Sequence, residues 1–154
     1  MSGDDGLDDL ERLLVERACE RLIHEYARRI DFGEAAAIAD LFVADGRWEG
    51  TELLLEGRDQ IREWFTRRGE LSRRVSRHVC TNVAVEPLSA DEATALTYMV
   101  NYRHDRAEGD DSLPVPAEAP KYVGELHDRF RLTDEGWRFV SRRVTVAFQR
   151  RRGS

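Results

Sequence analysis

The chain has 154 residues, 41% of them hydrophobic and 35% charged, and its formal net charge at pH 7 is −6. This length is typical of one domain with a single core, and the acidic balance argues against nucleic acid as a partner, because phosphate binding needs a basic face. No apolar run approaches the roughly 20 residues that span a membrane, so no membrane partner is expected. Since Cys19 and Cys80 show no metal or redox spacing and no signal peptide is evident, we expect reduced thiols and a cytoplasmic protein.

The first half of the chain is predicted to be mainly helical. Residues 7–30 form an amphipathic pattern, in which apolar residues recur at every fourth position and predict one long helix with a buried stripe. This stripe contains Leu10, Leu13, Leu14, Ala18, Leu22, Ile23, Tyr26, Ala27 and Ile30. Residues 34–43 favour a second helix and residues 57–69 a third, which ends at its glycine. The intervening RWEG segment, which contains Trp48, is predicted to be extended.

The second half alternates polar and apolar residues and is rich in β-branched side chains, which is typical of strands. Four candidate strands cover residues 72–88, 91–105, 121–135 and 136–150. Tight connections before the second and the fourth strand predict antiparallel hairpins. The connection at residues 107–120 is long, as in a lid or a disordered segment.

These elements predict an α+β fold in which three N-terminal helices pack on one face of a curved antiparallel sheet. We expect a single domain over residues 7–148, with flexible termini at residues 1–6 and 149–154. A sheet that curves around a long amphipathic helix leaves a cone with an apolar interior. Such a cone is a natural site for a small molecule.

Asp31, at the end of the first predicted helix, has two interpretations. A carboxylate in the last turn faces the negative end of the helix dipole, which is unfavourable. The DFGE segment places Asp31 three residues before Glu34, which is the spacing of a capping box for the next helix, worth about 1 kcal/mol. The alternative is a functional carboxylate that turns inward, and one residue can serve both purposes.

His78 lies in the middle of a predicted strand. Alternation places His78, Cys80, Asn82 and Ala84 on one face. If that face meets the helices, a titratable imidazole and an amide enter the apolar cone and need hydrogen-bonding partners. If it does not, His78 is a solvent-facing histidine.

Tyr26 and Arg142 are the other candidates for chemistry. Tyr26 lies on the buried stripe, where a tyrosine is most often a core residue with a satisfied hydroxyl. Arg142 is predicted to share a strand face with Val140, Val144 and Val146, so it either extends to water or is a cation held in a pocket. The four histidines, including a solvated His24, show no spacing for metal ligation, and no metal site is expected.

The chain as a whole resembles the SnoaL-like branch of the NTF2-like superfamily. The resemblance rests on the segments YARRIDFGEAAAIADLFVADGRWE, GRDQIREWF, RHVCTNVAVE and DRFRLTDEGWRFVSRRV, and it covers residues 10–148. It implies the cone-shaped α+β fold of that superfamily. The fold hosts enzymes, binding modules and non-catalytic subunits alike, so function depends on the site.

Within this branch, the chain is similar to the dehydratase and dehydrochlorinase group, which includes scytalone dehydratase and bile acid 7-alpha-dehydratase. Members pair an aspartate near the end of the first helix with a histidine on a central strand, and Asp31 and His78 match these positions. Tyr26 matches a residue one helical turn before the aspartate. Asn82 matches a strand asparagine, and Arg142 matches an arginine of the last hairpin.

The resemblance implies an elimination that needs neither a metal nor an organic cofactor. Asp31 would fix the tautomer of His78, and His78 Nε2 would remove a proton from a carbon beside an electron-withdrawing group. Tyr26 and Arg142 would stabilise the departing hydroxide and the developing negative charge. The implied substrate is a small cyclic or polyketide-like hydroxy-carbonyl compound. The residues expected to bind it are Asn82, Trp48, Tyr102 and His104, the last in loose alignment with a second strand histidine of scytalone dehydratase.

Two alternatives belong to other functional classes. The first is a non-catalytic subunit of the kind found in ring-hydroxylating dioxygenases, which shares the fold and serves assembly. The second is a module that binds a small apolar molecule without turnover. Isomerase and cyclase chemistry lie close to the elimination, because the same enolate can be reprotonated or can attack another carbon. The resemblance also implies a homodimer or homotrimer.

Overall fold

The computed structural model describes residues 6–152 and has an α+β architecture, as predicted. Its elements in chain order are α1 (Asp9–Asp31), the 3₁₀ helix η1 (Ala35–Leu41), β1 (Phe42–Glu49), β2 (Leu54–Glu56), α2 (Arg58–Gly69), β3 (Arg74–Pro87), β4 (Glu92–Asp105), β5 (Tyr122–Thr133) and β6 (Gly136–Gln149). The four long strands agree closely with the sequence prediction. The second predicted helix is a 3₁₀ helix, and the β1–β2 pair lies between it and α2. Of the termini expected to be flexible, residues 1–5 and 153–154 lie outside the described residues, whereas Gln149 is the last residue of β6.

The six strands form one mixed sheet in the order β2-β1-β6-β5-β4-β3. All neighbours are antiparallel, as predicted, except β1 and β6, which pair in parallel, so the expectation of an antiparallel sheet was wrong for this one pair. The exception has a topological reason. Since α2 and four strands separate β1 from β6 in the chain, no hairpin fixes their relative direction.

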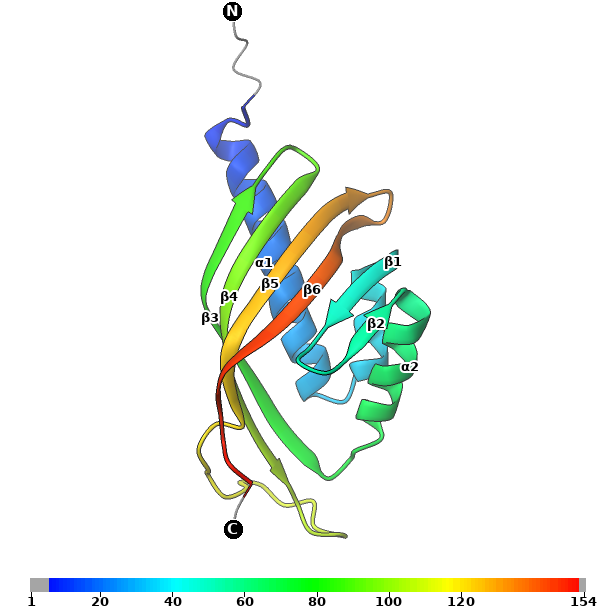
Figure 1. Ribbon diagram of the computed structural model, residues 1–154, viewed down its shortest axis with the longest axis vertical. Coiled ribbons are helices and arrows are strands. Elements are labelled where there is room, and N and C mark those ends of the chain that lie inside the picture. Colours follow the sequence, from blue (N-terminus) through cyan, green and yellow to red (C-terminus); the bar gives the residue numbers. More distant parts are fainter. Residues whose placement is uncertain (1–5, 153–154) are drawn as a thin grey trace, which may run out of the picture.

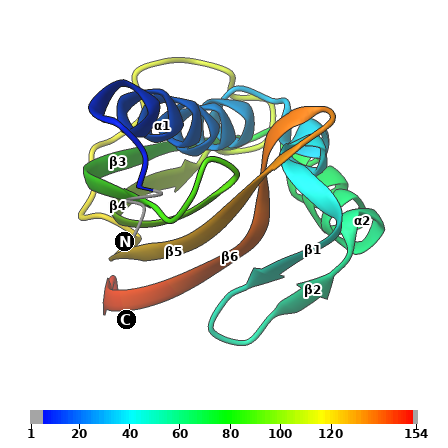
Figure 2. The same cartoon turned by 90° about the horizontal axis from the view of Figure 1, so that it is seen from above.

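Both α-helices lie on the same side of this curved sheet (Figures 1 and 2). Helix α1 packs mainly on β3, whereas α2 packs on η1 and β1. Among the described residues, no helix is long and apolar enough to cross a membrane. The core between the layers contains a series of neighbouring aromatic rings from α1, β1, α2, β5 and β6: Tyr26, Phe42, Phe65, Phe130 and Phe139.

Helix α1 begins with a capping box, in which Asp8 and Glu11 bond to each other's backbone N–H groups. Only its second half buries the predicted stripe. Leu10, Leu13 and Leu14 are 63%, 60% and 61% exposed, so their assignment to the core was wrong. Residues four apart turn about 400° along a helix, so such a stripe drifts by about 40° per step and leaves the sheet toward the N-terminus.

A β-bulge divides β3 into two halves. Thr81 pairs with Tyr98 but Ala84 pairs with Leu96, so two residues of β3 face one residue of β4 at this point. Asn82, in the bulge, has a left-handed φ of 50°. Beyond it the phase of alternation is reversed, and Val83 faces the core. The prediction that Asn82 and Ala84 share the face of His78 was therefore wrong.

A second irregularity lies between β5 and β6. Phe130 pairs with Phe139 and Arg129 pairs with Ser141, which leaves Val140 as an extra residue on β6. Phe139 and Arg142 consequently both face the inside of the sheet. The prediction that Val140 shares the face of Arg142 was wrong for this reason.

The connection between β4 and β5 has no regular secondary structure. Arg150, just after β6, holds it at its C-terminal end through Glu118, with 3.2 Å between Nη1 and Oε2, and through the carbonyl of Ala119. No residue from 107 to 120 lines the cavity described below. The idea of a lid therefore stays a prediction.

Candidate active site

A cavity of about 810 Å³ opens between the helices and the concave face of the sheet. This volume is in the range of sites for small molecules. Its walls come from the second half of α1, the β1–β2 turn, α2 and the inward-facing residues of β3 to β6. Four residues predicted from the sequence contribute to it from four different elements: Tyr26, Trp48, His78 and Arg142.

Asp31 directs its carboxylate into the fold and onto β3. Its Oδ1 lies 2.6 Å from Nδ1 of His78 and accepts the hydroxyl of Ser76 at 2.9 Å, while its Oδ2 accepts the backbone N–H of His78 at 2.7 Å. Its side chain is only 5% exposed. The N-cap of η1 is Glu34, with no side-chain hydrogen bond, so the capping-box interpretation of Asp31 was wrong.

His78 is held at both ring nitrogens. With a proton on Nδ1, which donates to Asp31, the other nitrogen is an acceptor. Nδ2 of Asn101 lies 3.1 Å from this Nε2 and can donate to it. Asn101 is 4% exposed and pairs with His78 across β3 and β4. Because the ring is fixed by both neighbours, its Nε2 is directed at the cavity wall formed by Asn101.

Asn101 is a site residue that sequence reasoning missed. Its strand carries Ala93, Ala95, Thr97 and Met99 at alternate positions before it, and all four are buried. The same alternation continues to Asn101. A buried amide requires a hydrogen-bond partner, and this pattern could have identified Asn101 as a site residue from the sequence.

Tyr26 and Trp48 meet across the cavity wall. Nε1 of Trp48 donates to the hydroxyl oxygen of Tyr26 at 2.9 Å, and the Trp48 ring stacks on Trp64 at 5.8 Å between centroids. Burial raises the pKa of Tyr26 to about 12. Tyr26 therefore keeps its proton near neutral pH, and because its oxygen is already an acceptor for Trp48, its O–H is available as a donor.

Arg142 is a fully buried cation held by Asp128. Its Nε and Nη2 lie 2.7 and 2.8 Å from the two carboxylate oxygens, and its guanidinium stacks on the rings of Tyr26 and Phe139. Burial alone lowers the pKa of an arginine, but Asp128 outweighs it and holds the pKa of Arg142 above its ordinary value. The third nitrogen, Nη1, is buried and has no hydrogen-bond partner among residues 6–152.

Asp128 was also missed from the sequence. It lies on β5 between the inward-facing Leu126 and Phe130, so alternation alone makes it a buried carboxylate. A buried carboxylate is costly unless it is paired. The position of Asp128 in the strand therefore predicts a cation next to its carboxylate.

Three residues predicted to bind substrate lie outside the cavity. Asn82 is exposed in the β3 bulge, where it accepts a hydrogen bond from Thr81. Tyr102 is 47% exposed on the outer face of the sheet. His104 contacts Glu118 at 3.4 Å, toward the β4–β5 connection. On β4 the inward positions are those of Asn101 and Arg103, and alternation directs Tyr102 and His104 the other way.

Comparison with known proteins supports the fold assignment. The structure of a protein described as a putative scytalone dehydratase, from Novosphingobium aromaticivorans, superposes on this chain with a TM-score of 0.75. The two sequences are 21% identical, with 92% of this chain and 90% of that chain covered. An NTF2-like protein with a cystatin-like fold from the same organism has a TM-score of 0.70 at 27% identity, with 92% of each chain covered. The hexachlorocyclohexane dehydrochlorinase LinA-type3 from Novosphingobium barchaimii has a TM-score of 0.73 at 17% identity, with 93% of each chain covered.

At these identities the structural likeness establishes the fold. No curated protein matches the sequence. The family model of the SnoaL-like domain matches residues 11–143, which is most of the chain. This range includes Asp31 and His78, here called the dyad, and their partners Ser76 and Asn101. The chain therefore belongs to the SnoaL-like domain family.

Proposed function

We propose that this protein is a cofactor-independent lyase that eliminates water from a small cyclic or polyketide-like hydroxy-carbonyl compound. The observation that carries the proposal is the 2.6 Å contact between Asp31 and Nδ1 of His78 at the wall of a cavity of small-molecule size. A histidine held in this tautomer has its lone pair on Nε2, where it serves as a general base.

In the first step, Nε2 of His78 removes a proton from the carbon next to the substrate carbonyl, and the C–H electron pair forms an enolate. Asp31 stabilises the imidazolium that results. The unpaired Nη1 of Arg142 supports a role as donor to the enolate oxygen, because a buried N–H without a partner gains most from a charged acceptor.

In the second step, the enolate electrons form a carbon–carbon double bond and the bond to the hydroxyl group breaks. The O–H of Tyr26 donates a hydrogen bond to the departing oxygen, and the proton held by His78 converts it to water. The free base is thereby restored. A general base contributes roughly 10²–10⁴-fold and one well-placed donor roughly 10²–10³-fold to the rate.

Asn101 has to respond to this proton transfer. Its amide N–H bonds to Nε2 of neutral His78, and substrate has to displace that bond. Once Nε2 carries a proton, rotation of the amide brings Oδ1 of Asn101 into place as its acceptor. Asn101 is thus proposed as a positioning residue that matches both charge states of the imidazole.

The proposal is tested with a panel of cyclic 3-hydroxy ketones, whose dehydration gives conjugated enones that absorb in the ultraviolet. We expect enone formation by the wild type and none above background by His78→Gln. Deuterium incorporation next to the carbonyl from heavy water reports the first step separately. Binding of the ketones without enone formation and without deuterium incorporation would contradict the proposal and favour a binding module.

A further inference from the structure

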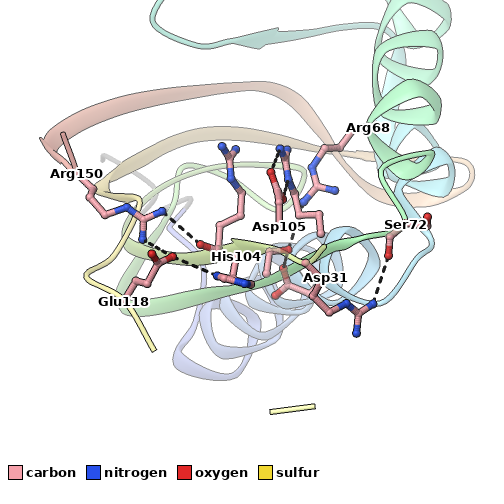
Figure 3. A network of polar contacts seen from close by, with 11 residues as sticks. Asp31, Arg68, Ser72, His104, Asp105, Glu118 and Arg150 are labelled. Carbon is pink, nitrogen blue, oxygen red and sulfur yellow. Dashed lines mark hydrogen bonds and ion pairs between the residues drawn. The ribbon is translucent and has the colours of Figure 1, made fainter. Parts of the chain in front are cut away.

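Apart from Arg142 and the exposed Arg67, which lies 3.9 Å from Glu63, the cavity is lined by three arginines from three elements. Arg68 lies in the last turn of α2, Arg74 at the start of β3 and Arg103 near the end of β4. In Figure 3, Arg68 extends from α2 toward the strands, on the side of Asp105 and Asp31. The chain has 24 lysines and arginines against 30 aspartates and glutamates, so the significance of this group depends on whether carboxylates neutralise it.

Carboxylates within the protein neutralise only part of this group. Arg74 forms two hydrogen bonds with Asp105, at 2.7 and 3.0 Å. The side chain of Arg68 has one hydrogen bond, to the hydroxyl of Ser76 at 3.3 Å. Among residues 6–152, no carboxylate lies within ion-pairing distance of Arg68 or Arg103. Two half-buried guanidinium groups therefore face the cavity without an anionic partner.

The charged forms of Arg68 and Arg103 are destabilised by their surroundings. Burial lowers the pKa of Arg68, and the nearby Arg74 and Arg103 lower it further. Burial and Arg74 likewise lower the pKa of Arg103. A bound anion would offset the repulsion between these partly desolvated like charges. The planar guanidinium group of arginine matches the geometry of carboxylate and phosphate oxygens.

The arginine group is connected to the proposed reaction centre through one side chain. The hydroxyl of Ser76 accepts from Arg68 and donates to Asp31, which holds His78. An anion bound to Arg68 therefore lies beside the dyad within the same cavity. It would anchor a substrate whose reacting carbons lie farther in, toward His78 and Arg142.

We propose that the natural substrate carries an anionic oxygen group, a carboxylate or a phosphate, and that Arg68 and Arg103 bind it with support from Arg74. The inference rests on the proposed function for the chemistry that follows at His78. The anion site itself depends only on the arginines and the cavity. An anion site in this cavity narrows the proposed substrate class from hydroxy-carbonyl compounds in general to acidic ones.

The test uses calorimetric titration with 2-naphthoate and with 2-naphthamide, a neutral compound of nearly the same shape. We expect the wild type to bind the acid at least roughly tenfold more tightly than the amide. Arg68→Gln and Arg103→Gln should each remove most of this preference. Arg73→Gln is the matched control, because Arg73 is exposed and does not line the cavity, and it should retain the preference.

Equal affinities of the wild type for the two compounds, or no detectable binding of the acid at millimolar concentration, would overturn the proposal. So would loss of the preference in Arg73→Gln to the same degree, which indicates a general charge effect. The 2-naphthyl phosphate ester distinguishes the two sources of the anion, since tighter binding than the acid assigns a phosphate and weaker binding a carboxylate. None of these titrations involves turnover. An intact preference for the acid, together with no enone formation from 3-hydroxy ketones that carry a carboxylate, therefore refutes the lyase and leaves the anion site standing.

Discussion

Nδ1 of His78 lies 2.6 Å from Oδ1 of Asp31, although 47 positions separate the two residues in the chain. The same carboxylate accepts the backbone N–H of His78 and the hydroxyl of Ser76. Three donors offset the cost of an acid at the negative end of α1. Helix stability alone favours a lysine or arginine at this end, so the acid is explained by the contact with His78.

The first prediction concerns Asp31→Asn. An asparagine can donate as well as accept, so it no longer enforces a proton on Nδ1 of His78. We expect the rate of the proposed elimination to fall by roughly 10²-fold or more. The nitrogen NMR shifts of the His78 ring should change from one tautomer to a mixture. Ser76→Ala is the control, because it removes one donor to Asp31 and leaves the dyad. An unchanged tautomer in Asp31→Asn would contradict the role of the carboxylate.

Asn101→Leu tests the positioning role of the amide. The substitution has a similar volume but removes the hydrogen bond to Nε2 of His78 and the acceptor for the imidazolium. We expect a loss of about tenfold in kcat with a smaller change in KM. The NMR signal of Nε2 should shift while that of Nδ1 stays in place. If both nitrogen signals and kcat are unaffected, the 3.1 Å contact has no role in the reaction.

Removing the acid of the buried Asp128–Arg142 pair should destabilise the protein more than removing the acid of an exposed ion pair. Asp128→Ala leaves an uncompensated cation in the core, and we expect the free energy of unfolding in urea to fall by about 3–5 kcal/mol. Asp105→Ala breaks a pair whose aspartate is 50% exposed, and the expected loss is about 1 kcal/mol or less.

Replacing both buried partners, as Asp128→Leu with Arg142→Met, should recover most of that stability because no lone charge remains. The double variant should still lack activity in the proposed elimination, since the donor Nη1 is gone. Similar losses of stability in Asp128→Ala and Asp105→Ala would show that burial does not set the strength of these pairs.

Tyr26 should make the protein less stable in alkaline solution. Its pKa in the folded state is about 12, against 10.0 for an ordinary tyrosine, so above pH 10 the unfolded chain loses the proton first. Stability from this group is complete below pH 10 and is lost as the pH rises toward 12. Tyr26→Phe removes that contribution. Urea unfolding of both proteins over this interval should show a steeper decline for the wild type, and parallel declines would contradict the assignment.

The sequence predicted the long strands well because their β-branched alternation is continuous and their turns are short. It also predicted the cavity positions of Tyr26, His78 and Arg142, once a family resemblance had linked them. The failures have a common cause. Asn82 and Val140 are displaced by bulges, and a bulge depends on how two strands pair, which alternation within one strand does not record.

Other residues were missed because their partners are distant in the chain. Asn101 and Asp128 occupy inward positions that alternation identifies, yet their importance comes from His78 and Arg142 on neighbouring strands. The exposed Leu10 and Leu14 show the opposite error. Their spacing is helical and apolar, but the buried face of this part of α1 is that of Val15 and Cys19, because a stripe with a period of four drifts around the helix.

Because of the extra residue in β3, the inward side chains of this one strand line the cavity before the bulge and pack in the core after it. Before the bulge the inward side chains are Ser76, His78 and Cys80, which belong to the cavity and its hydrogen bonds, and after it they are Val83 and Val85, which belong to the core. Deleting Asn82 would shift the phase of the strand by one, so that either the valines turn to solvent or the imidazole does. Asn82, exposed and outside the cavity, thus marks the position in β3 at which the cavity-lining residues end and the core residues begin.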